Sequence, residues 1–564
     1  MSLAMKTDYD TITPIGEVQG SGLWSELAGK KVTVQGVVTA TARRGFFLQS
    51  VESSSDPLVS DAIFVFSRKW KAETGALVRV SGKVVDFFKQ ENDKPVTQIK
   101  LKDAKLIKRR GPVIKPFELT ADNVPEDPDE LAIFLNGLEG MLVSIEAGQT
   151  FISPSNHYGD YVLILDAEKP VQGVIRSEHN GVLIDHHNPS RWFPGFRMKD
   201  YKLAPCLNVG SKLLTSVVGP LNYRVESYQI NVTHPIRVEQ SHYPLNKSCL
   251  EPEAGFITIM TLNGFNLDAH VESRSMVKNP DQDVDDDLGE GRFETLAEAV
   301  VNQANVPDIV ALQEIQDNDG AEISMVVDAS LTYAALIREI KKLSGVEYHW
   351  VDIAPGVGTD GGQPGGSIRN GFLYNPATVE LLESSVRSIG LDEAAYDGSR
   401  KPLLAHFVDK VSGKELACLN IHLASKRHQH SIFAPEKAGH DARLPVRVKQ
   451  AEIVREELLL LRQQGLDYYV TGDFNDSEVS ETLAALLGDE SVNLVDSLLP
   501  EQRYDYNHRG KLQVLMHGIV SREMAEVRAQ YDIIHGNELL GVKPGQPSDK
   551  PSDHAYVMAK IKMS

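Results

Sequence analysis

The chain has 564 residues, more than one hydrophobic core usually holds, so two to four domains are expected. It is 41% hydrophobic and 24% charged, an ordinary globular composition, and no apolar run approaches the length of a membrane-spanning helix. The formal net charge of −20 argues against a protein that coats nucleic acid non-specifically. It makes a small phosphoester substrate more plausible, but it leaves room for a nuclease with a local basic rim.

Residues 20–115 contain short strands separated by glycine. We expect these strands at 31–38, 45–50, 62–66, 77–84 and 97–101. Their spacing predicts a small β-barrel, and their order resembles the OB-fold module. Aromatic and basic residues around Phe46, Phe47 and Trp70 could bind a single strand, but aromatic side chains that fill the barrel are the favoured interpretation.

Two further N-terminal assignments follow from the same pattern. Residues 1–19 are expected to be a leader or linker, with no visible signal peptide. Residues 116–250 are again rich in strand-like segments and resemble a second, decorated OB-like barrel, although long polar insertions such as 174–204 obscure its detail.

Residues 251–564 alternate strands with amphipathic helices, which we expect at 292–304 and 447–464. The segment 467–475 is an apolar strand that stops at Gly472 and then presents Asp473 and Asn475 on the same side. A carboxylate and an amide in this position suit work on a phosphate. Four other polar clusters occur at the ends of apolar runs: Thr261–Asn266, Val310–Glu314, Leu419–Leu423 and Ser552–His554.

These five clusters, in this order, resemble the endonuclease/exonuclease/phosphatase superfamily over about residues 255–564. The segments 368–374, 424–426 and 447–451 are similar to those of bacterial extracellular nucleases. The resemblance implies an α+β protein whose residues 251–564 form a DNase I-like, four-layer α/β-sandwich behind two OB-like barrels. Since such nucleases are often exported, we expect a secreted or cell-envelope protein, with a cytoplasmic location not excluded.

Phosphodiester hydrolysis needs a hard cation that polarises the phosphoryl oxygen, and magnesium takes one or two carboxylates together with water and substrate oxygens. Glu314 and Asp553 are the candidate metal ligands, with Asn263 in support, and the resemblance implies the same set. We therefore expect Mg²⁺, or Mn²⁺ or Ca²⁺ in its place.

The remaining roles are catalytic or substrate-binding. Asp473 is expected to orient or deprotonate the attacking water, and Asn475 to hold a phosphate oxygen. His422 and His554 are expected to stabilise the transition state and to move protons. The candidate residues for binding phosphate or substrate are Asn266, Arg369, Asn370, Lys426 and Arg447.

Each residue has a structural alternative when taken alone: Glu314 as a strand-end cap, His422 as a core histidine, Asp473 as a loop residue, and Asp553 with His554 as a turn. Five coincidences in family order favour the functional interpretation. For Lys426 and Arg447, a solvated surface charge is an equally good interpretation.

One position departs from the family pattern. The superfamily usually carries an aspartate in the strand before the final Ser-Asp-His, where it pairs with the last histidine, but Met516 stands there. Methionine cannot accept a strong hydrogen bond from an imidazole. Three outcomes remain open: another group such as Asp505 or His517 orients His554, the enzyme is slow, or the site binds without cutting. The sequence predicts that Met516→Asp raises activity.

Three smaller features need an interpretation. The aspartate-rich segment 281–287 invites a calcium interpretation, but a solvated acidic loop is favoured because the EF-hand glycine and glutamate are not in register. The segment 356–366 holds six glycines and is a candidate lid. Cys206 and Cys249 could pair in an oxidising compartment, and Cys418 is expected to be a buried thiol.

The leading hypothesis is a metal-dependent phosphodiester hydrolase that cuts DNA or RNA. The alternatives are a phosphatase or phosphodiesterase on a small or lipid phosphoester, and a nucleic-acid-binding protein whose site is weakened at Met516.

Overall fold

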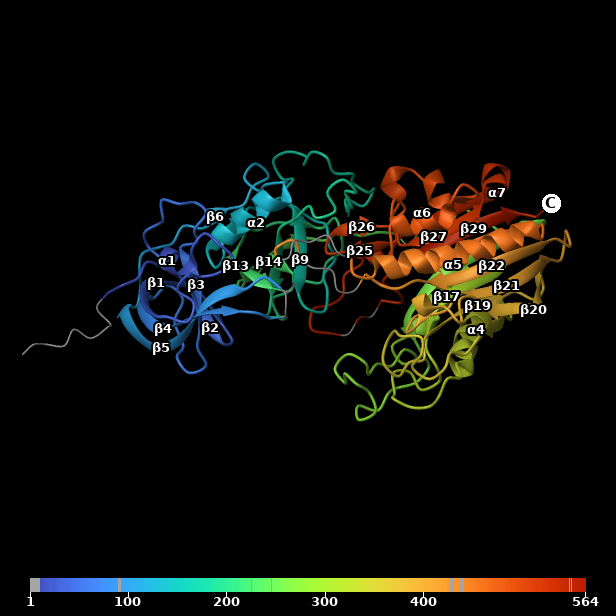
Figure 1. Ribbon diagram of the computed structural model, residues 1–564, viewed down its shortest axis with the longest axis horizontal. Coiled ribbons are helices and arrows are strands. Elements are labelled where there is room, and N and C mark those ends of the chain that lie inside the picture. Colours follow the sequence, from blue (N-terminus) through green and yellow to red (C-terminus); the bar gives the residue numbers. More distant parts are fainter. Residues whose placement is uncertain are drawn as a thin grey trace, which may run out of the picture.

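The computed structural model describes residues 11–89, 93–224, 226–244, 246–426, 431–435, 441–546, 548 and 550–563. The molecule is elongated, with a barrel at one end, a β-rich unit in the middle and an α/β-sandwich at the other end (Figure 1). Within these residues, no helix is both long enough and apolar enough to cross a bilayer.

The N-terminal strands close into a five-stranded barrel, as the sequence predicts. They are β1 (Lys31–Ala42), β2 (Gly45–Gln49), β3 (Ala62–Phe66), β4 (Leu77–Phe87) and β5 (Val96–Lys108), in the order β1-β2-β3-β5-β4. Phe46 and Phe47 are 1% and 4% exposed, so the aromatic side chains fill the interior as favoured. The short helix α1 (Ile15–Gln19) lies in the expected leader, yet Ile15 and Val18 belong to the barrel core.

The middle unit differs from the second barrel that the sequence predicts. It is a nine-stranded sheet in the order β15-β12-β8-β9-β11-β14-β13-β7-β6. Its strands are β6 (Phe117–Glu118), β7 (Leu142–Ile145), β8 (Thr150–Phe151), β9 (Asp160–Ile164), β11 (Gly195–Met198), β12 (Lys212–Leu213), β13 (Val217–Arg224), β14 (Ser227–Val232) and β15 (Val238–Glu239). Four of these strands have two residues, because long connections take up most of the chain. Helix α2 (Pro128–Gly137) contributes Leu131 and Leu135 to the core.

The C-terminal part contains two six-stranded sheets. The first has the order β18-β19-β17-β16-β29-β28 and the second β20-β21-β22-β23-β27-β24. The strands of the first are β16 (Phe256–Leu267), β17 (Ile309–Ile315), β18 (His349–Asp352), β19 (Arg369–Tyr374), β28 (Ala529–Ile534) and β29 (Tyr556–Lys562). Those of the second are β20 (Val379–Ser388), β21 (Leu403–Asp409), β22 (Glu415–His422), β23 (Asp467–Asp473), β24 (Ser491–Asn493) and β27 (Met516–Ser521).

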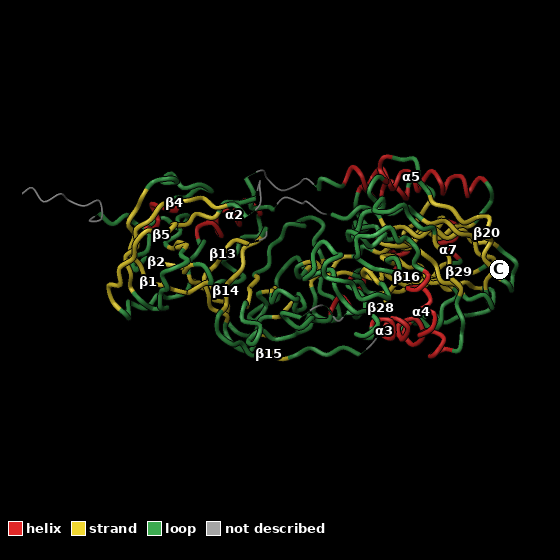
Figure 2. Tube along the Cα trace, turned by 90° about the horizontal axis from the view of Figure 1, so that it is seen from below, coloured by secondary structure: helices red, strands yellow, loops and turns green. Residues whose placement is uncertain are grey.

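Helices cover both outer faces of this pair of sheets. They are α3 (Arg292–Glu298), followed by a π-turn at Ala299–Gln303, α4 (Ser330–Ser344), α5 (Leu444–Gln463), α6 (Glu481–Leu487) and α7 (Arg522–Val527). Figure 2 shows α5 on one side of the strands and α3 and α4 on the other. One core lies between the sheets, and separate cores lie under α3 and α4 and under α5 and α6. The predicted four-layer arrangement is therefore present in this part of the chain.

The middle unit and the sandwich are joined by a small third sheet. Strand β10 (Val182–Leu183) pairs in parallel with β26 (Lys511–Gln513), which forms a hairpin with β25 (Tyr506–His508). A second link is Phe433, which follows β22 in the sequence but is 3% exposed within the core of the nine-stranded sheet. These contacts bring the middle unit close to the end of the sandwich where the polar clusters lie.

Candidate active site

The predicted polar residues meet at one end of the two sheets. Strand β16 runs parallel to β17, and β22 runs parallel to β23, so the residues that end these strands lie at the same edge. Below them, Gln313 Nε2 donates to Asn420 Oδ1 at 2.7 Å, and Asn420 Nδ2 donates to the backbone oxygens of Leu312 and Gly371. Because both side chains are fully buried, these hydrogen bonds fix one sheet against the other beneath the site.

Glu314 stands on an irregularity of β17. Its φ is +56°, a left-handed conformation that costs a non-glycine residue about 1–3 kcal/mol and persists where the surroundings enforce it. Asn263 Nδ2 donates to Glu314 Oε1 at 3.3 Å, and the backbone N–H of Asn266 donates to Oε2 at 3.1 Å. The two asparagines thus hold the carboxylate, which agrees with the supporting place expected for Asn263.

His422 and Asp473 end the neighbouring strands β22 and β23. His422 Nε2 lies 3.5 Å from Asp473 Oδ2 and 3.9 Å from Glu314 Oε1. The close approach of β23 to β22 needs Gly472, because a Cβ there would lie 1.9 Å from the Ile421 carbonyl oxygen. Asn475, with φ of +52°, donates its backbone N–H to Asp473 Oδ1 at 2.8 Å and its side-chain amide to the Leu423 carbonyl at 3.1 Å.

His554 completes the group, and its partner is Asp505. His554 Nδ1 lies 2.9 Å from Asp505 Oδ1, while Asp505 Oδ2 accepts from the backbone N–H groups of Leu515 and Met516 at 2.8 and 2.9 Å. The other ring nitrogen, Nε2, lies 3.6 Å from Asp473 Oδ2. Of the groups that the sequence offered as partners for His554, the structure therefore has Asp505 in contact with its ring.

Met516 has no part in this contact. Its side chain is fully buried in the apolar core between the sheets, while its backbone supports Asp505. We therefore no longer expect Met516→Asp to raise activity. An aspartate would enter an apolar core, and the orienting carboxylate is already present.

The protonation states of the two histidines are driven apart. Burial, together with the nearby Arg400 and His554, holds the pKa of His422 well below its usual value, so this imidazole is neutral. Burial alone would also lower the pKa of His554, but the carboxylates of Asp553, Asp505 and Asp473 raise it to about 10. The site therefore holds one neutral imidazole and one imidazolium.

Two residues of this group have no motif in the sequence. Arg400 is 8% exposed, donates to the Leu423 carbonyl at 2.9 Å, and lies close enough to Glu314 and Asp473 to lower their pKa values. Tyr506 lies against His554, with ring centroids 4.8 Å apart. Arg400 comes from the loop between β20 and β21, and Tyr506 from a three-residue strand, so neither follows a long apolar run.

Arg369 and Asn370, predicted to bind phosphate, also have structural partners within the protein. The buried Arg369 guanidinium pairs with Asp352 at 3.2 Å and donates to the Ser367 carbonyl at 2.9 Å. Asn370 Nδ2 donates to the carbonyls of Lys401 and Asn420. Both side chains lie beside a cavity of about 600 Å³ bordered by residues of the glycine-rich segment 356–366.

Arg447 also differs from its prediction. It is fully buried on α5, where Nε pairs with Asp476 at 3.2 Å, Nη2 with Asp441, and Nη1 with the Ala424 carbonyl at 3.3 Å. A buried guanidinium with these partners holds the loop after β22 in place rather than meeting a phosphate. Lys426, 29% exposed, pairs with the same Asp476 at 2.8 Å and stays closer to the surface.

The donor set of Glu314 and Asp553 fits a hard divalent cation. Burial, and then the charge of Asp553, raises the pKa of Glu314 to about 7, so the two carboxylates repel each other. Asp553 has a side chain that is 33% exposed and can carry ligand-bound water. A cation between them would offset this repulsion.

The aspartate-rich segment is not the solvated loop favoured from the sequence. Asp287 is 1% exposed and pairs with Arg292, which also donates to the Gly264 and Phe265 carbonyls beside Asn263. Oxygen atoms of Asp268, Asp285 and Asp287 lie within 4.8 Å of one another. The acidic cluster, defined as Asp268, Glu272, Asp285 and Asp287, is therefore largely buried next to the strand that carries Asn263.

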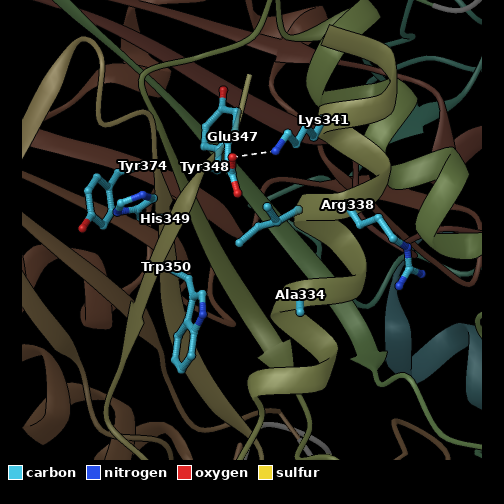
Figure 3. A pocket seen from close by; sticks show the side chains of 9 residues that line it. Ala334, Arg338, Lys341, Glu347, Tyr348, His349, Trp350 and Tyr374 are labelled. Carbon is cyan, nitrogen blue, oxygen red and sulfur yellow. Dashed lines mark hydrogen bonds and ion pairs between the residues drawn. The ribbon is translucent and has the colours of Figure 1, made fainter. Parts of the chain in front are cut away.

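The cysteines and a second cavity lie apart from this group. Cys206, Cys249 and Cys418 are free thiols; the first two are exposed, and Cys418 is buried as expected. A cavity of about 600 Å³ lies between α4 and the edge strand β18, lined by Lys341, Glu347, Trp350 and Tyr374 among others (Figure 3). It includes none of the catalytic or metal-binding candidates.

Comparison with known proteins gives two kinds of result. A family model described as a domain of unknown function (DUF8508) matches residues 70–241, from the barrel to the end of the nine-stranded sheet. Comparison with curated proteins finds no match.

Among solved structures, the chain is similar to D. rerio TDP2 humanized by 14 mutations, with 16% identity over 54% of this chain and 99% of that one, at a TM-score of 0.34. It is similar to the endonuclease/exonuclease/phosphatase from Bacteroides vulgatus, with 15% identity over 55% and 99% of the two chains, at a TM-score of 0.34. The human Nocturnin catalytic domain gives 13% identity over 55% and 94%, again at 0.34. Likeness at this level carries no weight for function, which has to come from the geometry of the site.

Proposed function

We propose that the chain is a metal-dependent phosphodiester hydrolase of the endonuclease/exonuclease/phosphatase type, with DNA or RNA as its substrate. The observation that carries the proposal is the meeting of Glu314, His422, Asp473 and His554 at one edge of two sheets, with ring and carboxylate atoms 3.5–3.9 Å apart. These residues come from four separate parts of the sequence. Such convergence of titratable groups with shifted pKa values is typical of active sites.

In this proposal the buried residues have separate catalytic roles. Burial raises the pKa of Asp473 above its usual value, which makes this carboxylate a better base for a water molecule. His554, charged and held by Asp505, stabilises negative charge that develops on phosphate oxygens, as does Arg400. Neutral His422 is available to accept or donate a hydrogen bond at a further oxygen.

Glu314 and Asp553 would hold the cation, with Asn263 orienting Glu314. When bound, Mg²⁺ or Mn²⁺ supplies Lewis acidity and offsets charge on the phosphate. The strained backbone at Glu314, Asn266 and Asn475 supports this assignment, because strain of this kind is concentrated at functional sites.

One observation supports a polynucleotide over a small phosphoester: the motifs resemble those of bacterial nucleases. The weakened-site alternative loses its main support, because Asp505 replaces the carboxylate that Met516 lacks.

The test is cleavage of supercoiled plasmid DNA, and of a single-stranded RNA, in Mg²⁺ or Mn²⁺ and in EDTA. We expect the wild type to cut at least one of them only with metal, and His422→Ala to lose about 10³-fold or more of this activity. His406→Ala is the matched control, since His406 pairs with Glu415 on β21 and β22. The proposal fails if the wild type cuts neither polymer with either metal. If the wild type hydrolyses only small phosphoesters, the protein is instead a phosphatase or phosphodiesterase on a small substrate.

A further inference from the structure

Tyr506 lies over the imidazole of His554 at the open side of the site. The two ring centroids are 4.8 Å apart and the planes are inclined by 27°. Tyr506 follows Asp505 directly, so one short segment supplies both the carboxylate that holds His554 Nδ1 and the ring that covers its face. The tyrosine is part-buried rather than fully enclosed.

The hairpin that carries Tyr506 is anchored in the middle unit. Its turn at Arg509 and Gly510, with φ of +50° and +87°, packs so closely on Ile152 and Val162 that a Cβ on Gly510 would lie 2.9 Å from Ile152. Asn507 Nδ2 donates to the Ile152 carbonyl at 3.0 Å, and β26 pairs with β10. Tyr506 is therefore fixed from two sides before any substrate arrives.

The hydroxyl of Tyr506 is close enough to the carboxylates of the site for their charges to act on it. Burial, and then the carboxylates of Asp553, Asp473 and Glu314, raise the pKa of this phenol far above its usual value. At neutral pH the group is thus a neutral O–H that can donate. No hydrogen bond joins it to another residue within the described parts of the chain, so its donor is available to a ligand.

We infer that Tyr506 is a further substrate-contacting residue of the site, whose hydroxyl donates a hydrogen bond to an oxygen of the scissile phosphate while its ring holds His554 in place. This role rests on the proposed function and deepens it, because it adds a neutral donor to the charged groups around the phosphate. The competing role is purely structural: a ring that packs on His554 and whose hydroxyl does nothing.

Tyr506→Phe separates these roles, because it keeps the ring and removes only the hydroxyl. We expect kcat for plasmid cleavage in Mn²⁺ to fall about 10- to 100-fold with KM changed less than about threefold, the loss of a hydrogen bond to a charged group. Tyr504→Phe is the matched control. Tyr504 is two residues away, fully buried, and stacked on His535 rather than His554. Activity of Tyr506→Phe within about twofold of wild type overturns the inference.

Binding of inorganic phosphate in the presence of Mn²⁺, measured by calorimetry on the full chain, keeps the inference separate from the proposed function. If the wild type cuts no diester, the proposed function fails, but phosphate binding that is about tenfold weaker in Tyr506→Phe still supports the donor role. Equal binding by the two proteins, or no binding by the wild type, overturns it. Matching melting temperatures of wild type and Tyr506→Phe show that neither result comes from unfolding.

Discussion

The active site and the acidic cluster are two groups of buried carboxylates in the same sandwich, and they are balanced differently. In the site, Glu314 and Asp473 alternate with His422, His554 and Arg400. In the acidic cluster, Arg292 pairs with Asp287, and its charge also acts on Asp285. Burial and neighbouring charge raise the pKa of Asp268 there to about 9 and that of Asp285 to about 7.

The difference shows what makes buried acids useful for chemistry. Burial raises the pKa of carboxylates in both groups, but in the site the charges of Arg400 and His554 act against this rise. In the acidic cluster, the charges of neighbouring carboxylates raise the pKa values of Asp268 and Asp285 further. The site keeps one exposed edge at Asp553, whereas Asp268, Glu272 and Asp287 of the acidic cluster are each 5% exposed or less. Each of the following variants changes this balance of charges around a buried carboxylate at one residue.

The largest effect is expected for Asp505→Asn. The amide keeps the shape but cannot stabilise the imidazolium of His554, so kcat should fall about 10²- to 10⁴-fold, as when the orienting acid of a catalytic triad is neutralised. Steady-state cleavage of plasmid DNA measures the change. Asp496→Asn, on an exposed carboxylate of the same region, is the control. Full activity of Asp505→Asn would show that the charge of Asp505 has no part in catalysis.

Met516→Asp places a carboxylate where no cation balances it. Since the side chain lies in the apolar core between the sheets, we expect a loss of about 3–5 kcal/mol in the free energy of unfolding and no gain in kcat. Met516→Leu, of similar volume, is expected to cost less than about 1.5 kcal/mol. Urea denaturation measures both. A stable Met516→Asp variant with a higher kcat than wild type would contradict this prediction and show that a carboxylate at position 516 can assist His554.

Arg400→Gln makes the site resemble the acidic cluster by removing a cation beside Glu314 and Asp473. We expect kcat to fall about 10- to 100-fold, and Arg400→Lys, which keeps the charge, to lose less. The comparison of the two variants at saturating Mn²⁺ separates charge from geometry. Equal losses would show that the shape and hydrogen bonding of the guanidinium matter rather than its charge.

The smallest effect is expected for Asp285→Asn. Because the pKa of Asp285 is raised by burial and by Asp287, the folded protein binds this proton more tightly than the unfolded chain does. Its contribution to stability is thus complete below about pH 4 and is lost as the pH rises through about 7.

In EDTA, the melting temperature of Asp285→Asn should therefore exceed that of wild type by about 2–4 °C at pH 8, and by clearly less at pH 5. Differential scanning calorimetry at the two pH values measures this. The exposed Asp281→Asn is the control, for which no pH-dependent difference is expected. An Asp285→Asn variant that is less stable than wild type at pH 8 would contradict the predicted repulsion.

The strand-end residues were accessible to prediction because they interrupt apolar periodicity. Glu314, His422 and Asp473 each follow a run of buried residues, and the structure brings their side chains together. The barrel strands and the amphipathic helices around 292–304 and 447–464 were accessible for the same reason.

Other parts depend on tertiary contacts that no local pattern reveals. Asp505 reaches His554 from a segment 49 residues earlier in the chain, and Arg400 reaches Glu314 from a loop. Arg447 has the sequence context of a surface helix, yet it is buried because Asp441 and Asp476 pair with it. The nine-stranded sheet was predicted as a barrel because the sequence of its short strands does not show whether the sheet closes on itself.

The most direct test of the account is an anomalous difference map from a crystal soaked in Mn²⁺. The account predicts the strongest peak between the carboxylates of Glu314 and Asp553. A strongest peak at Asp268, Asp285 and Asp287 instead, with none at Glu314, would contradict it.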